Sequence, residues 1–325
     1  MLSRVADSLY WMSRYLERAE HTARMLDLNL SLLDQETDAT ERRWSWVLAS
    51  LRAVMPAKHG ERSRVYAITE HLTFNPRNHD SLVACVTSAR ENARQVREQI
   101  STEMWEQLNQ LYLSVRQARM QDIYAQPHEF YRPIKEGSHL FQGLTDATMT
   151  HGEGWHYLQL GRFIERASAT ASLLDVHLRG LVTEPESLPA ETLAVSADHL
   201  SWVALLKCCT AFEAYVQVHT AELQPERIAE FLLLNAESPR SVRFAADHIE
   251  RSLQALQRNA GRTRAGRAER LAGKLRSTLN YAQVDEIMAD DLHAYLADIQ
   301  HQGGQIHDAI QQQYITYAID VALAS

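Results

Sequence analysis

One segment of the chain occurs twice, and this repeat constrains the fold more than any other feature of the sequence. Residues 14–27 read RYLERAEHTARMLD and residues 162–175 read RFIERASATASLLD, so eight of fourteen positions are identical without a gap. Unrelated segments would share about one position, at ordinary residue frequencies of roughly one in twenty. We therefore predict an internal duplication, with a first repeat over about 1–147 and a second over about 148–325.

Each copy has the apolar periodicity of an α-helix. Apolar residues recur at alternating steps of three and four, which places them on one continuous stripe. The stripe comprises Leu9, Met12, Leu16, Ala19, Ala23, Leu26, Leu30 and Leu33 in the first copy, and Tyr157, Leu160, Ile164, Ala167, Ala171, Leu174, Leu178 and Leu181 in the second. The small alanines in the middle of both stripes allow a partner helix to approach closely.

The opposite face of both helices carries arginine and glutamate. It comprises Tyr10, Trp11, Arg14, Glu17, Arg18 and His21 in the first copy and Arg162, Glu165 and Arg166 in the second. Charged faces are usually solvated, but here the charges repeat between the copies and the two aromatic residues favour burial. Three interpretations stay open: ion pairs inside a helical bundle, which we favour, a ligand or partner site, and a plain surface.

Duplicated helices of one bundle often meet around a two-fold axis, where each copy offers what the other receives. We therefore expect Glu17 to contact Arg166, and Glu165 to contact Arg18. Arg14 and Arg162 each precede a glutamate by three residues, so we expect them to support that glutamate along their own helix.

The remaining sequence predicts an all-α fold. Glycine (12 residues) and proline (8 residues) are scarce, and no alternating β-branched run is bounded by turn residues. Further echoes link the two halves, because Ser45-Trp46-Val47 recurs as Ser201-Trp202-Val203, and Asn75 recurs as Asn235. The long period excludes a short solenoid repeat. We predict one pseudo-symmetric helical bundle over residues 1–325 rather than two independent domains.

Proline and glycine set the expected helix boundaries. In the first half we expect helices over 3–34, 40–55, 63–72, 79–99 and 101–119. Pro127 and Pro133 are expected to interrupt the chain before a shorter helix over 134–146. In the second half we expect one helix that ends near 179 and another over 193–221.

Composition excludes several classes of function. The net charge of −8 argues against general nucleic-acid binding, and no apolar run approaches the roughly 18 residues of a membrane span. Arg4 and Asp7 interrupt any secretory pattern at the N-terminus. Three cysteines, two of them adjacent, suggest neither a disulfide framework nor a zinc site. A cytoplasmic location is therefore expected.

The two glutamates are weak candidates for metal ligands. Di-iron bundles use Glu-x-x-His motifs, whereas Glu20 and His21, which follow Glu17, correspond to Ser168 and Ala169 in the second copy. Flanking arginines suit ion pairing better than metal binding. The sequence also lacks a phosphate-binding glycine loop and a nucleophile-elbow motif. We therefore expect no metal, no cofactor and no nucleotide on this chain.

One basic run stands out near the C-terminal quarter of the chain. It comprises Arg258, Arg262, Arg264, Arg267, Arg270, Lys274 and Arg276, against Glu269 alone. Such a run can hold phosphate or an acidic partner. We favour a solvated helix face at the outer edge of the bundle.

Several motifs together resemble the bacterial Alpha-E domain family. They are Leu2-Ser3-Arg4-Val5-Ala6, Leu9-Tyr10-Trp11, the segment from Arg14 to Glu20, the Ala89-Arg90-Glu91-Asn92-Ala93-Arg94 motif, and Gly154-Trp155 with the segment from Gly161 to Ala167. The resemblance covers essentially the whole chain, and it implies an α-helical protein with a Glu-Arg motif. Arg90, Glu91, Asn92 and Arg94 form a secondary motif of interest.

The resemblance also implies a functional setting. Members of this family are encoded beside, or fused to, a circularly permuted ATP-grasp protein, and a transglutaminase-like peptidase is a possible further partner. ATP-grasp enzymes join a carboxylate to an amine through an acyl phosphate. The implied role is a helical subunit of an amide- or peptide-ligase system that shapes or presents the acceptor substrate. The alternative is an enzyme in its own right that uses Glu17 or Glu165 as an acid or base.

Overall fold

The computed structural model describes residues 1–32, 38–54, 63–182, 193–219 and 222–316. These residues form α-helices joined by short loops, with no β-strand among them, so the prediction of an all-α fold is confirmed. The helices of the first half are α1 (Ser3–Ser31), α2 (Asp38–Ser50), α3 (Arg64–Thr73), α4 (Leu82–Gln95), α5 (Thr102–Gln117), α6 (Met120–Ala125) and α7 (Pro127–Thr148). Those of the second half are α8 (Glu153–Val182), α9 (Leu193–Cys208), α10 (Phe212–His219), α11 (Pro225–Leu234), α12 (Val242–Asn259), α13 (Arg267–Tyr281), α14 (Val284–Ala289) and α15 (Leu292–Ile310).

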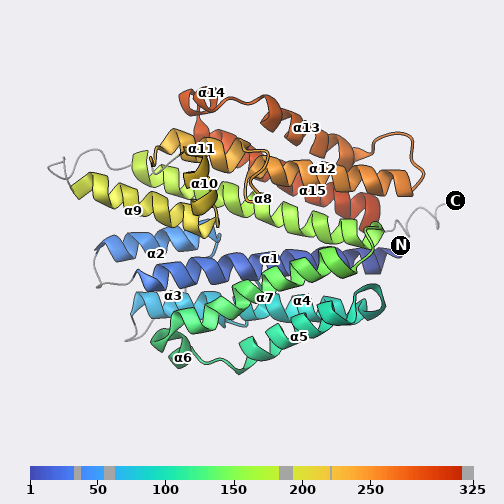
Figure 1. The fold of residues 1–325 in the computed structure, drawn as a ribbon, viewed down its shortest axis with the longest axis horizontal. Helices are drawn as coiled ribbons and strands as arrows, with labels where there is room; N and C mark the ends of the chain where they lie inside the picture. Colours follow the sequence, from blue (N-terminus) through green and yellow to red (C-terminus); the bar gives the residue numbers. More distant parts are fainter. Residues whose placement is uncertain (33–37, 55–62, 183–192, 220–221, 317–325) are drawn as a thin grey trace.

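The long helices α1 and α8 lie side by side in the middle of the molecule (Figure 1). On one side α4 and α7 pack against α1, and α5 packs against both of them. On the other side α12 and α15 pack against α8, and α13 packs against both. The same order of helices therefore surrounds each central helix. The duplication itself stays a prediction from the sequence.

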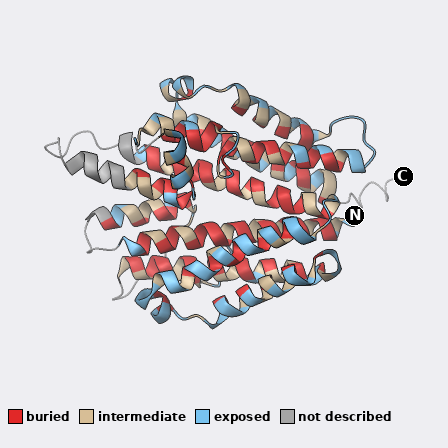
Figure 2. Ribbon diagram, in the orientation of Figure 1, coloured by how far each residue is buried: buried red, intermediate tan, exposed pale blue. Residues whose placement is uncertain are grey.

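Both central helices are buried on more than their apolar stripe (Figure 2). In α1 the stripe residues Leu9, Met12 and Leu26 are fully buried. Burial of a side chain of this size contributes about 1.5–3 kcal/mol. Much of the opposite face of α1 is also covered, because Tyr10, Glu17 and His21 are buried there. The charged residues on that face consequently need partners inside the bundle.

Close packing of α1 on α8 depends on small residues at Ser13 and Gly161. A Cβ atom on Gly161 would overlap the carbonyl oxygen of Tyr10 and would lie 3.2 Å from Cβ of Ser13. The alanines were expected to allow the close approach, but Ser13 and Gly161 form this contact. It matters for the site because Glu17 and Glu165 lie one helical turn further along.

Two helix ends differ from the sequence prediction for the same reason. Arg52 has a left-handed backbone (φ 51°), and the Ala53 amide donates to the Leu48 carbonyl at 2.8 Å. This turn ends α2 at Ser50 instead of near residue 55. Thr210 (φ 52°) ends α9 in the same way, so the helix expected over 193–221 is divided into α9 and α10.

The two prolines between the halves do not interrupt the chain as predicted. Pro127 is the first residue of α7, a position where its missing N–H is not needed. Pro133 lies inside α7 and does not interrupt it. The helix begins at Pro127, seven residues before the expected start at residue 134. The end expected for the first helix, near residue 34, lies outside the described residues. In the described part of the chain, no helix combines the length and apolar character needed to cross a bilayer.

Candidate functional site

The Glu17 carboxylate is enclosed by arginine. Arg166 of α8 donates from Nε to Oε1 at 2.6 Å and from Nη2 to Oε2 at 2.9 Å, a bidentate ion pair. Arg240, which precedes α12, donates to the same carboxylate at 3.1 Å, and Gln142 of α7 donates at 3.1 Å. The Glu17 side chain is 3% exposed and that of Arg166 is 7% exposed. This pair is therefore a buried ion pair within the bundle.

The Glu165 carboxylate receives two arginines from α1. Arg18 donates from Nε at 2.6 Å and from Nη2 at 3.0 Å, and Arg14 donates from Nε at 2.9 Å. Arg18 also pairs with Asp80, in the loop before α4. Both expected cross-pairs, Glu17 with Arg166 and Glu165 with Arg18, are thus present. The central helices are held together by reciprocal ion pairs as well as by apolar packing.

The expectation for Arg14 and Arg162 was wrong. Arg14 does not support Glu17 on its own helix, because it reaches across to Glu165. Arg162 donates to Gln159, one turn earlier on α8, and its buried Nε has no hydrogen-bond partner among the described residues. Burial and the nearby charge of Arg166 together lower the pKa of Arg162 to about 10. The two Glu-Arg clusters are therefore not equivalent.

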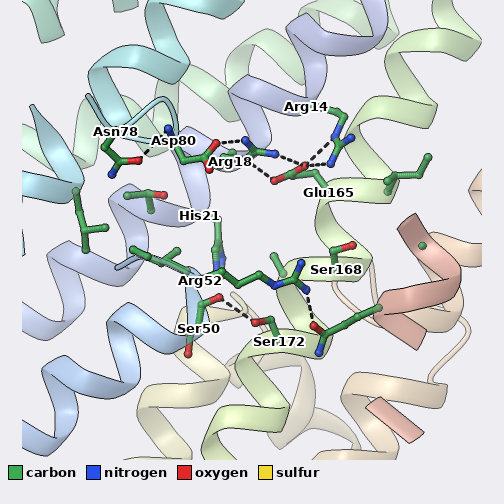
Figure 3. A pocket seen from close by; sticks show the side chains of 18 of the residues that line it. Arg14, Arg18, His21, Ser50, Arg52, Asn78, Asp80, Glu165, Ser168 and Ser172 are labelled. Carbon is green, nitrogen blue, oxygen red and sulfur yellow. Dashed lines mark hydrogen bonds and ion pairs between the residues drawn. The ribbon is translucent and has the colours of Figure 1, made fainter. Parts of the chain in front are cut away.

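The clusters also differ in access to open space. Next to Glu17 the structure leaves a cavity of only about 10 Å³, too small for a ligand. Glu165, in contrast, lines a cavity of about 480 Å³ that Figure 3 shows from close by. Arg14, Arg18 and His21 line the same cavity, together with residues that the sequence analysis did not select. We call this cavity the Glu165 pocket.

The Glu165 pocket lies between α1, α8 and α15, and two loops close it. One loop is residues 51–54, after α2, and the other contains Arg77, Asn78 and Asp80, before α4. Four arginines (Arg14, Arg18, Arg52 and Arg77) and two carboxylates (Asp80 and Glu165) line it. The lining therefore carries both signs of charge, with an excess of two positive charges (4 − 2 = 2).

Two histidines of the pocket are held neutral. Burial and the nearby charge of Arg240 together lower the pKa of His21 to about 4. The pKa of His307, on α15, is lowered to about 4 by burial and by Arg14. His307 Nδ1 also hydrogen-bonds the hydroxyl of Tyr10 at 2.8 Å. At neutral pH both rings are uncharged hydrogen-bonding groups.

Tyr10 and Trp11 support the pocket from behind. Tyr10 is fully buried and stacks on His307, with ring centroids 5.6 Å apart. The guanidinium of Arg14 lies 4.8 Å from the centroid of the Trp11 ring, a cation–π contact. Neither aromatic residue lines the cavity. Their role is to fix the positions of Arg14 and His307.

The secondary motif serves the packing of α4 on α5. Arg90 lies over the rings of Trp105 and Tyr112 and donates to Asn109 at 3.1 Å. Asn92 caps a carbonyl of its own helix, and Arg94 forms an exposed ion pair with Glu91. The motif does not reach the Glu165 pocket. We therefore interpret it as structural.

The basic run lies along the end of α12 and the start of α13, away from the pocket. Arg276 pairs with Asp247 and Glu250, and Arg262 lies over the Tyr314 ring. Arg258, Arg264 and several others of the run are exposed, as the predicted solvated edge of the bundle requires.

The ion pairs restrict what the two glutamates can do chemically. The pKa of Glu17 is lowered to about 2, because Arg166 and Arg240 outweigh the effect of burial. Arg14 and Arg18 likewise lower the pKa of Glu165 to about 2. Both groups are therefore ionised at neutral pH and are weak bases. Among the described residues, no group of three or more His, Cys, Asp or Glu side chains is placed to hold a metal ion.

Several residues around the two glutamates were not predicted from the sequence, although some left a trace in it. Gly303 and Gly304 are adjacent glycines inside a helical pattern, which is unusual without a functional or packing reason. Asp80 and Arg240 each follow an echoed asparagine by five residues, at Asn75 and Asn235. No local pattern marked Arg52, because its conformation depends on how α2 ends.

We expect Gly304→Ala to stabilise the protein by about 0.5–1 kcal/mol, because glycine weakens a helix interior by roughly that amount relative to alanine. A Cβ atom at Gly304 would meet nothing within 4 Å, so no clash offsets the gain. Urea unfolding measures the change. Gly143→Ala on α7 is a matched control, since its Cβ atom would also meet nothing within 4 Å. Destabilisation by Gly304→Ala would show that neighbouring atoms crowd α15 at this residue and would contradict the open space beside it.

The fold and the site define a class of protein: an all-α bundle in which two central helices exchange Glu-Arg ion pairs and one pair lines a pocket. This chain belongs to the Alpha-E family, described as a predicted alpha-helical domain with a conserved ER motif, whose model matches residues 1–315. Glu17-Arg18 and Glu165-Arg166 are the Glu-Arg sequences of its two central helices.

Curated relatives are longer proteins without a described role. Uncharacterized proteins of Mycobacterium bovis and of Mycobacterium tuberculosis (strain CDC 1551) are 25% identical over 324 residues, and one of Mycobacterium tuberculosis (strain H37Rv) is 24% identical. Each alignment covers 91% of this chain and 34% of the relative, so the chain spans about a third of their length. No solved structure matches this chain significantly.

Proposed function

We propose that this chain is a helical subunit of an ATP-grasp amide- or peptide-ligase system, and that it holds the acceptor substrate in the Glu165 pocket. The observation that carries the proposal is this pocket, which is built from both charge signs in a chain without a phosphate-binding glycine loop. Such a chain is suited to hold a polar substrate while another protein supplies the nucleotide chemistry.

The charge states in the pocket favour binding over proton transfer. A general acid or base works best with a pKa near the working pH. Here Glu165 has a pKa of about 2, and His21 and His307 each have a pKa of about 4. The alternative function, an independent enzyme that uses Glu17 or Glu165 as acid or base, therefore has little support from the site. Glu17 additionally lacks space for a substrate.

The length of the relatives supports a shared task. In the mycobacterial proteins the matching region forms 34% of the chain, so it is joined to further sequence in one polypeptide. Joining two regions in one chain raises the effective concentration of one for the other. A function carried out together with a second domain or protein is consistent with that arrangement.

Co-expression with the neighbouring circularly permuted ATP-grasp protein tests the proposal. We expect the two proteins to elute together in size-exclusion chromatography at roughly micromolar concentration. Such co-elution requires a Kd of about 1 μM or lower, which corresponds to a binding free energy of about −8 kcal/mol. An ATP-grasp enzyme of unrelated sequence is the negative control, and a transglutaminase-like peptidase is a further partner to include. Elution of the ATP-grasp protein and this chain in separate peaks would contradict the proposal.

A further inference from the structure

Three features of the Glu165 pocket lower the stability of the fold or leave a polar atom unsatisfied. They are the backbone of Arg52, the glycines of α15, and the ring nitrogen of His21. Departures from stability rules tend to concentrate at functional sites. All three occur in one cavity, so together they indicate which chemical groups a ligand of this cavity would carry.

Arg52 occupies a position where glycine is the usual residue. Its φ of 51° is the left-handed conformation that ends α2, which strains any residue with a Cβ atom. The Arg52 guanidinium reaches the neutral amide of Gln300 on α15, and Figure 3 shows it on the same side of the pocket as Ser168. Arg77, on the facing loop, has no ion pair among the described residues. Two cations of the lining are therefore left without a carboxylate partner.

Gly303 and Gly304 form the α15 wall of the pocket. A Cβ atom at Gly303 would reach only ordinary contact with Oγ of Ser168, at 3.4 Å, and one at Gly304 would meet nothing within 4 Å. Neighbouring protein atoms therefore do not require glycine at residue 304, although glycine costs about 1 kcal/mol inside a helix. Glycine here keeps the cavity open and lets a ligand approach the helix backbone.

His21 brings an unused polar atom to the same cavity. The residue is 8% exposed, yet its Nε2 atom has no hydrogen-bond partner within the described structure. A buried polar atom without a partner costs about 1–3 kcal/mol. A ligand that hydrogen-bonds Nε2 would remove that cost on binding.

The mixture of charges narrows the ligand class. Arg52 and Arg77 attract a carboxylate. Glu165 is compensated by Arg14 and Arg18, whereas Asp80 only shares Arg18 with it and is the acidic group left to face a ligand. Asp80 is 62% exposed, so it is accessible to a cationic group. We propose that the Glu165 pocket binds an amino acid or the end of a short peptide, with its carboxylate toward Arg52 and Arg77 and its amine toward Asp80 and His21. The positive excess of the lining favours an acidic one.

This proposal rests on the proposed function only in treating the Glu165 pocket as the acceptor site. Its test uses the purified chain without any partner, so its failure and the absence of an ATP-grasp complex are separate results. Calorimetric titration compares L-glutamate with glutarate, which has the carboxylates but no amine, and with 1,4-diaminobutane, which has amines only. Inorganic phosphate is the fourth probe, because arginine pairs also bind phosphate.

We expect L-glutamate to bind, glutarate to bind at least about fivefold more weakly, and 1,4-diaminobutane and phosphate not to bind at about 10 mM, where even a millimolar ligand would be detected. If a probe of a single charge sign bound as tightly as L-glutamate, the proposal would be overturned. Absence of L-glutamate binding to the folded protein at that concentration would also overturn it.

Two variants connect binding to this cavity. Arg52→Gly removes a cation and relieves the backbone, so the protein should fold at least as well while affinity falls about tenfold, as for loss of a charged hydrogen bond. Gly304→Phe should fill the cavity and abolish binding. The matched controls are Thr210→Gly, at the same left-handed position after α9, and Gly143→Phe on α7; neither residue lines the pocket. Unchanged affinity in both pocket variants would place the ligand elsewhere and refute the assignment.

Discussion

Glu17→Ala should lower the free energy of unfolding by about 3–5 kcal/mol, because it leaves the buried guanidinium of Arg166 without its partner. The pair is bidentate, with both side chains less than a tenth exposed. Arg166 would keep only its hydrogen bond to the Pro239 carbonyl, at 3.2 Å. Urea unfolding followed by circular dichroism measures the loss.

Arg166→Ala should cost less than Glu17→Ala, since Glu17 would keep Arg240 and Gln142. In the double variant, the loss in the free energy of unfolding should be well below the sum of the two single losses, because each single change already breaks the same contact. Small and additive losses would contradict the burial of this ion pair.

Glu165→Ala is the matched comparison within the same fold. It strands Arg14 and Arg18, but both border an open cavity and Arg18 keeps Asp80. We therefore expect a loss of about 1–2 kcal/mol, between the values for exposed and buried pairs. Equal losses for Glu165→Ala and Glu17→Ala would show that the Glu165 pocket is not open to water.

Lowering the pH from 7 to 5 should remove about 3–4 kcal/mol of stability through His21 and His177 alone. Burial lowers the pKa of each of these residues from 6.5 to about 4. Between those two values the unfolded chain binds protons that the folded chain does not bind. Stability is therefore fully present above pH 6.5 and falls as the pH approaches 4, by up to about 1.4 kcal/mol per pH unit for each histidine.

The glutamates add a second loss at lower pH. Their pKa values are lowered from 4.5 to about 2 by the facing arginines, so their contribution is present above pH 4.5 and is lost as the pH falls toward 2. The histidines therefore act first. His139, His248 and His307 also have lowered pKa values, but they are partly exposed and should contribute less.

Urea midpoints at pH 7, 6 and 5 measure the predicted loss. Glutamine keeps a polar side chain but does not titrate, so His21→Gln and His177→Gln should each remove about half of the pH dependence. The double variant should keep only the smaller pH dependence that the partly exposed His139, His248 and His307 contribute. A wild-type midpoint that is the same at pH 7 and pH 5 would contradict the neutral, buried state of both rings.

Local periodicity was sufficient to predict that the central segments are helices and that the two copies pair with each other. The apolar stripe of residues 9–33 predicts a buried helix, and the repeated Glu-Arg sequence predicts that Glu17 meets Arg166 and Glu165 meets Arg18. Both results depend on spacing along a helix and on charge complementarity between two helices. Spacing and charge type are present in the sequence itself.

The inequality of the two pairs was decided only by the tertiary structure. Arg14 and Arg162 occupy matching sequence positions, yet Arg14 reaches Glu165 while Arg162 stays on its own helix. Arg240 and Gln142 close the space around Glu17, whereas Gly303 and Gly304 leave space beside Glu165. Gln142 of α7 and Arg240 before α12 are each more than a hundred residues from Glu17 along the chain. The two glycines of α15 are likewise more than a hundred residues from Glu165.

The sequence by itself therefore determined an all-α protein whose central helices carry complementary Glu-Arg pairs. Only the tertiary structure decided that Glu17 is sealed in the bundle and that Glu165 faces a pocket with Arg52, Arg77 and His21. The physical reason is that side-chain spacing follows from local helix geometry. The space left beside a side chain, in contrast, depends on the volumes of residues that distant segments bring to it.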